Sequence, residues 1–174
     1  MINIILKFGL LSGGIIVLIP LISGFFMGYG AETFAIAEVI GYVNMVLSLS
    51  LIFFGMQSYK STYVNGYVGF NTLFRIGLGI SFIAGVMFGF YNVVHVIVID
   101  PEFMERYYAY SISNIQSAEM SQALIDQKVA EMEEQKAMFM NPLVNFLAMF
   151  TTVFVIGLLV TVFSGLIQRD KYAK

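Results

Sequence analysis

The chain has 174 residues, of which 59% are hydrophobic and only 11% are charged, and its net charge is −2. A soluble domain carries about 25% charged residues, so this composition indicates an integral membrane protein. The sequence has no cysteine and one histidine, which excludes disulfides, thiolate chemistry and histidine-based metal sites. It also lacks the basic face that binds nucleic acid.

Four apolar segments are long enough to cross a bilayer, since about 20 helical residues span a hydrocarbon core of about 30 Å. They cover residues 4–27, 36–56, 74–99 and 142–167. We predict that each is a helix, because a spanning backbone must satisfy its own hydrogen bonds. The first holds Pro20, which should kink it. We interpret that segment as a retained span, and a cleaved signal sequence is the alternative.

Few polar side chains lie inside these spans. Glu38, Asn44 and Ser48 lie in the second, and Asn92 and His95 lie near the end of the third. An ionisable side chain within a span is a functional candidate by default. Glu38 and His95 should lie at a similar depth and could form a pair. A hydrogen-bonded histidine at the membrane interface is the interpretation we favour.

The link between the second and third spans, QSYKSTYVNGYVGFNTLFR at residues 57–75, is basic and aromatic. Asn65-Gly66, flanked by aromatic and β-branched residues, is typical of a tight hairpin turn. We expect the link to lie among the headgroups of anionic lipids. It provides either simple anchoring or a specific lipid or partner site. The candidate headgroup contacts are Lys60, Arg75, Tyr59 and Tyr63.

Small side chains recur at every fourth position of the third span. They are Gly77, Ser81, Gly85 and Gly89. Such a stripe lets two helix backbones approach closely in lipid. We favour packing within the bundle, with the seam of a homodimer as the alternative.

The segment 100–141 is polar and acidic. Asp100-Pro101-Glu102 predicts a helix start capped by Asp100, and a short helix over 101–110. We expect a break at SISN (111–114) and a second helix over 117–139. Asn141-Pro142 repeats the capping pattern before the fourth span. The segment should form a helical hairpin, either as a cap packed on the bundle or as a docking surface for a partner.

Charge asymmetry predicts the orientation in the membrane. The N-terminus, the 57–75 link and the C-terminal tail share one side, with six basic residues and one acid. The other side has three basic residues and ten acids. Since basic residues concentrate in the cytoplasm, both termini should be cytoplasmic.

Several motifs then invite a comparison. They are Lys7-x-Gly9, GMQSYK, NGYVGFNTLFRIGLGI, DPEFMERY, NPLVNF and a closing QRDK. Together they resemble an uncharacterised bacterial family of four-span membrane proteins, the domain-of-unknown-function family 4199. The chain departs from that family's double-glycine turn, with Asn-Gly-Tyr at 65–67. The resemblance covers nearly the whole chain. It implies the same topology in a bacterial inner membrane and assigns no activity.

The sequence therefore predicts a single all-α domain over residues 1–174, a four-helix membrane bundle with an extracytoplasmic hairpin. Paired deep carboxylates, a Ser-His-Asp set and a phosphate-binding glycine loop are not evident, so we expect neither an enzyme nor a cofactor. The leading hypothesis is a structural or accessory module that binds membrane lipids, a partner membrane protein or a second copy of itself. The alternative is a small oligomeric transporter or channel, lined by Asn44, Ser48, Asn92 and His95.

Overall fold

The computed structural model describes residues 1–28, 30–63 and 68–170, and every secondary-structure element within them is helical. Two short elements, η1 (Ala31–Thr33) and the π-helical turn η2 (His95–Ile99), accompany the α-helices. The α-helices are α1 (Ile2–Met27), α2 (Phe34–Leu49), α3 (Leu51–Tyr63), α4 (Phe70–Val94), α5 (Phe103–Gln116), α6 (Gln122–Phe139) and α7 (Pro142–Gln168).

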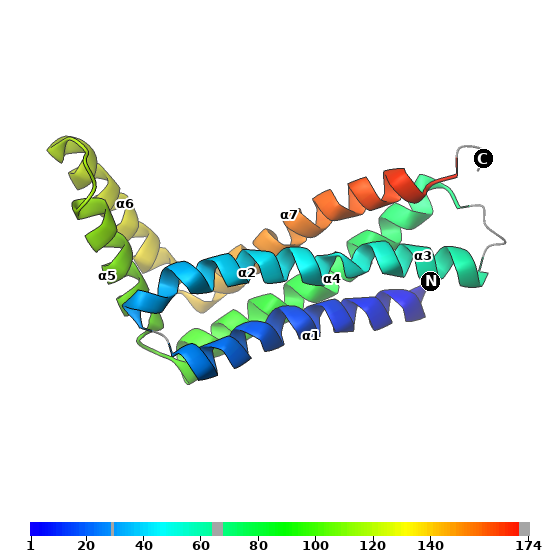
Figure 1. Cartoon of the computed structure of the whole chain (residues 1–174), viewed down its shortest axis with the longest axis horizontal. Helices are drawn as coiled ribbons and strands as arrows, with labels where there is room; N and C mark the ends of the chain where they lie inside the picture. The colour runs from blue at the N-terminus through cyan, green and yellow to red at the C-terminus, as the bar shows by residue number, and fades with distance from the viewer. Residues whose placement is uncertain (29, 64–67, 171–174) are drawn as a thin grey trace.

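Four helical stretches are long and apolar enough to cross a membrane, as the sequence predicts. They are Ile2–Phe26, Phe34–Thr62, Phe70–Ile99 and Pro142–Gln168. Helices α2 and α3 together form the second, with Ser50 as the single turn residue between them, and they run on in the same direction (Figure 1). Helix α1 runs through Pro20 without interruption. The composition and these four stretches mark the chain as a membrane protein.

Helix α4 packs along α7 and also against α1 and α3. The core between these helices consists of branched apolar side chains such as Ile16, Ile52 and Ile80, all fully buried. Many large apolar side chains, including Val39 and Phe163, instead point outward. Such a surface would be unfavourable in water, but it matches the acyl chains of a bilayer. The hairpin of α5 and α6 projects from the end of the bundle opposite to the N-terminus (Figure 1).

The stripe of small residues on α4 lies against α7 of the same chain. A Cβ added at Gly85 or Gly89 would lie 3.1 or 3.0 Å from a backbone oxygen of α7, and one at Gly77 would lie 2.5 Å from the Thr161 side chain. Ser81, the remaining member, is fully buried and donates a hydrogen bond to Gly77 O at 2.8 Å. The stripe is therefore used for close packing of two helices within one chain.

The prediction for the 100–141 segment is wrong about the break between its helices. Helix α5 continues to Gln116, and the break falls at residues 117–121. Ser111 Oγ and Ser113 Oγ donate to carbonyls one turn back, Tyr107 O at 2.9 Å and Tyr110 O at 2.8 Å. Because these hydroxyls are satisfied inside the helix, they have no need to interrupt it.

The capping predictions have different outcomes at the two ends of this segment. The Asp100 side chain does not cap α5; its carboxylate pairs with the guanidinium of Arg106 instead. Asn141 does cap α7, since its Oδ1 accepts from Leu143 N at 3.0 Å and from Val144 N at 3.4 Å. The predicted turn at Asn65-Gly66 lies outside the described residues.

A polar clasp, made of Lys60, Asp170, Gln168, Val68 and Phe53, joins α3 to the end of α7. Lys60 Nζ lies 3.1 Å from Asp170 Oδ1 and donates to Gln168 O at 2.6 Å. Asp170 Oδ2 accepts from Val68 N at 2.7 Å, and Gln168 Nε2 donates to Phe53 O at 2.9 Å. The Val68 N–H and then the Lys60 ammonium lower the pKa of the Asp170 carboxyl below its ordinary value.

Substituting Gly157 should destabilise the contact between α4 and α7. A Cβ there would lie 2.7 Å from the Ser81 Cβ, so Gly157→Ala should cost about 1–3 kcal/mol through overpacking. The measurement is resistance to unfolding in dodecyl sulfate. Ser81→Gly in the same chain should restore most of the loss. Gly14→Ala is the control, because its Cβ would meet nothing within 4 Å. No loss in Gly157→Ala would contradict the packing described.

Removing the Asp170 carboxylate should open the clasp. Its folded pKa is depressed, so its contribution to stability is present above the unfolded pKa of about 4 and is lost as pH falls through the folded pKa. Asp170→Asn should therefore lower Tm at neutral pH, and the difference from wild type should vanish in strong acid. Thermal unfolding across pH measures this. A difference that stays constant down to strong acid would show that charge is not involved.

Candidate functional site

The polar side chains in the middle of the second span fasten α2 to α1. Asn44 Nδ2 donates to Ile16 O at 3.1 Å, and Ser48 Oγ donates to Asn44 Oδ1 at 3.0 Å. Ser12 Oγ completes the chain with a hydrogen bond to Ser48 O at 2.8 Å. All three side chains are buried. Asn44 and Ser48 thus satisfy each other and a helix backbone rather than line a shared opening.

The candidate headgroup contacts, at the end of the bundle that holds the N-terminus, have separate environments. Lys60 is held in the clasp with Asp170, and Tyr59 packs against the buried core. Arg75 is exposed on the first turns of α4. Tyr63 is the last residue of α3, and its side chain is outside the described part of the chain, as are Asn65 and Gly66. The structure therefore leaves Arg75 as the exposed cation of this group.

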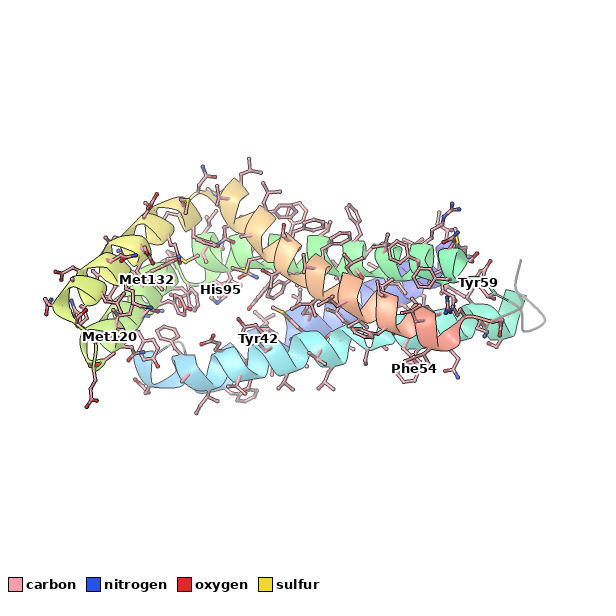
Figure 2. The ribbon with its side chains drawn as sticks, turned by 90° about the horizontal axis from the view of Figure 1, so that it is seen from above. Tyr42, Phe54, Tyr59, His95, Met120 and Met132 are labelled. Atoms are coloured by element: carbon pink, nitrogen blue, oxygen red, sulfur yellow. The ribbon has the colours of Figure 1, made fainter. Side chains whose placement is uncertain are left out.

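A cavity of about 250 Å³ lies at the other end of the bundle, between α1, α2, α4 and α5. Its walls bring together three of the polar side chains that the sequence singles out, Glu38, Asn92 and His95. Figure 2 shows His95 where α4 meets the hairpin, with Tyr59 at the opposite end of the molecule. The remaining walls are apolar, small or aromatic: Pro20, Ser23, Gly24, Gly28, Thr33, Phe34, Ala37, Ile40, Gly41, Phe88, Tyr91, Phe103 and Tyr107.

Aromatic rings connect the bundle to the hairpin at this cavity. Phe34, which begins α2 and is 5% exposed, has its ring centroid 5.8 Å from Phe103, 5.7 Å from Tyr107 and 5.5 Å from Tyr110. The His95 ring lies edge-on to Phe103 at 5.0 Å. Such offset and edge-to-face pairs are favourable beyond the area they bury. They fix α5 against the spans and so form one wall of the cavity.

The π-helical turn η2 places His95 on this wall. Asp100 N donates to His95 O at 2.8 Å, which is a hydrogen bond across five residues rather than four. The extra residue per turn lets α4 end with His95 buried, at 5% exposure, while Val98 and Ile99 remain exposed. Single π turns are frequent at functional sites.

Glu38 contributes a negative charge to the wall of the cavity. Its carboxylate is exposed on α2 and lines the cavity. Burial raises the pKa of the Tyr107 hydroxyl, and the nearby negative charge of Glu38 raises it further. Asn92 Nδ2 is engaged with Phe88 O at 3.1 Å. Among the described residues lining the cavity there is no lysine or arginine.

Sequence reasoning identified the polar members of this site and missed most of its aromatic walls. Phe34 and Phe103 stand at helix starts, where a lone phenylalanine carries no distinguishing signal. It also did not predict that Asn145 and Thr161 of α7 would be fully buried with side-chain polar atoms that make no hydrogen bond within the described residues. No group of three or more acidic or histidine side chains in that same part of the chain is placed to bind a metal ion.

Comparison with known proteins gives one result. The chain matches no curated protein and no solved structure. A family model described as "Protein of unknown function (DUF4199)" matches residues 7–170, which is nearly the whole chain and includes most of the first apolar stretch and all of the other three. The family expected from the sequence motifs is thereby confirmed, and the chain belongs to the DUF4199 family of proteins of unknown function.

Proposed function

We propose that this protein is a non-enzymatic module of a bacterial inner membrane that binds a lipid or another small apolar molecule between its helices. The observation that carries the proposal is the cavity of about 250 Å³ with aromatic walls. Ligand sites in proteins are mostly apolar concavities with a few convergent polar groups, often between the helices of a bundle. Glu38, Asn92 and His95 are the convergent groups here.

The arrangement of polar groups favours binding over transport. A path across the membrane would need polar side chains along the whole length of one opening. Asn44 and Ser48 instead hydrogen-bond to each other and to α1, whereas Asn92 and His95 line a cavity at one end only. Two of the four residues expected to line a small oligomeric channel, Asn44 and Ser48, are therefore not free to line one.

The proposed orientation has both termini in the cytoplasm and the hairpin outside. The N-terminus and the end of α7 lie at one end of the bundle, and α5 and α6 lie at the other (Figure 1). The basic residues cluster at the first end, and the acids cluster at the second. This distribution is the one that the positive-inside rule favours. The cavity would then open near the outer surface of the membrane.

Filling the cavity should release its occupant. Gly41 lines the cavity, and a Cβ there would meet nothing within 4 Å, so Gly41→Phe should place its ring in the cavity. Native mass spectrometry of wild-type protein extracted with its own lipids should show a stoichiometric bound molecule. Gly41→Phe should lose that molecule. The matched control is Gly14→Phe on α1, where an added Cβ would also meet nothing within 4 Å and which does not line the cavity. A bare wild-type protein, or a ligand retained in Gly41→Phe, would refute the proposal.

Labelling of single cysteines should report the orientation, since the native chain has no cysteine to give background. Gln135→Cys on α6 and Ser61→Cys on α3 replace exposed residues at opposite ends of the molecule. A membrane-impermeant maleimide applied to spheroplasts should label Gln135→Cys and spare Ser61→Cys. Both should react after the membrane is permeabilised. The reverse pattern in intact spheroplasts would place the termini outside.

A further inference from the structure

Glu38 is the only acidic residue in the four apolar stretches. A carboxylate within a span is costly, so such groups usually pair with a cation or serve a function. The structure records no ion pair for Glu38 within residues 1–28, 30–63 and 68–170. Its charge faces a cavity whose described lining contains no lysine or arginine. Among the described residues, no lysine or arginine pairs with this carboxylate.

The other walls of the cavity suit a positive charge as well. Five aromatic side chains line it: Phe34, Phe88, Tyr91, Phe103 and Tyr107. The face of an aromatic ring attracts a cation through its quadrupole, and the attraction grows when water is excluded. Aromatic cages recurrently hold quaternary ammonium groups, and a nearby carboxylate adds the attraction of an opposite charge. An anionic ligand would meet repulsion from Glu38 with no lysine or arginine in the described lining to offset it.

Size limits the ligand to a small organic cation or the end of a larger one. An apolar cavity of about 150 Å³ is enough to hold benzene. The cavity here measures about 250 Å³, so a ring or short alkyl group fits together with a substituted ammonium. The apolar part would lie along Pro20, Ile40 and Phe88, and the ammonium would lie toward Glu38.

Resting on the proposed function of this cavity, we propose that its ligand carries an ammonium group joined to a small apolar part, and that Glu38 and the surrounding aromatic rings recognise the charge. Two sources offer this chemistry. One is the headgroup of an amino lipid such as phosphatidylethanolamine, and the other is a free amine or quaternary ammonium compound. The recognition is the same in both, and the test separates them.

Two probes of the same shape isolate the charge. They are 4-fluorobenzyltrimethylammonium and its neutral carbon analogue, 1-fluoro-4-neopentylbenzene. Binding is measured by fluorine NMR line broadening with the full chain in nanodiscs of phosphatidylglycerol, with empty nanodiscs as the baseline for partitioning. The wild-type protein should bind the cation about tenfold or more tightly than the neutral analogue. Glu38→Gln should remove that preference while still binding the neutral probe.

The matched control is Glu32→Gln. Glu32 is an exposed acid on η1 at the same end of the molecule and does not line the cavity, so its loss should leave the preference intact. Equal binding of the two probes, unchanged by Glu38→Gln, would overturn the inference and leave the proposed binding function standing. If neither probe binds the wild-type protein, both fail.

The lipid composition identifies the source of the ammonium group. Adding phosphatidylethanolamine to the nanodiscs should weaken binding of the cationic probe if the lipid headgroup is the natural occupant, because the two compete for one site. Unchanged binding supports a free ammonium compound. Gly41→Phe, which fills the cavity, should abolish binding of both probes in either composition. Specific binding that survives this substitution would place the site elsewhere and overturn the inference.

Discussion

The close approach of α4 to α7 is the contact on which the rest of the structure depends. Lipid gives two apolar helices no hydrophobic reason to associate, so their attraction must come from packing at short range. The stripe from Gly77 to Gly89 lets the backbone of α7 come within van der Waals contact of α4. With that pair fixed, α4 offers its other sides to α1 and α3. The helices of the spans are thus ordered around one element.

Polar groups are used sparingly, and each group has a distinct place. In the middle of the bundle, Ser12, Asn44 and Ser48 donate hydrogen bonds to one another or to backbone carbonyls, and these bonds join α1 to α2. At the end of the bundle that holds the N-terminus, Lys60 and Asp170 neutralise each other in the clasp. Buried polar groups that satisfy each other fix a packing arrangement and offer nothing to a ligand. Glu38 differs from these groups because its carboxylate lines a cavity and has no ion pair among the described residues.

The sequence predicted the spans well because hydropathy and length directly reflect the physics of a bilayer. It also predicted the cap of α7, since Asn141 before Pro142 acts through local geometry alone. It failed at residues 111–114, where serines that favour turns in isolation bond back within α5. Composition suggests where serine prefers to lie, but it does not reveal whether a helix can satisfy the hydroxyl.

The cavity shows a deeper limit of sequence reasoning. The distances of Glu38 and His95 from the ends of their spans predicted that they lie at the same depth in the membrane. Equal depth does not by itself predict that both side chains line the same cavity, as they do. That shared wall requires the start of α2 at Phe34, the π turn at His95 and the docking of α5, and Phe34 precedes the other two by more than sixty residues of chain. Because Phe103 and Tyr107 belong to the hairpin and the remaining walls belong to the bundle, the shape of the cavity depends on how the hairpin docks. A ligand that touches both parts must stabilise their docking by its own differential affinity. If the proposed ligand binds, the hairpin and the cavity become coupled parts of one site, and the rings around Phe34 are the contact that joins them.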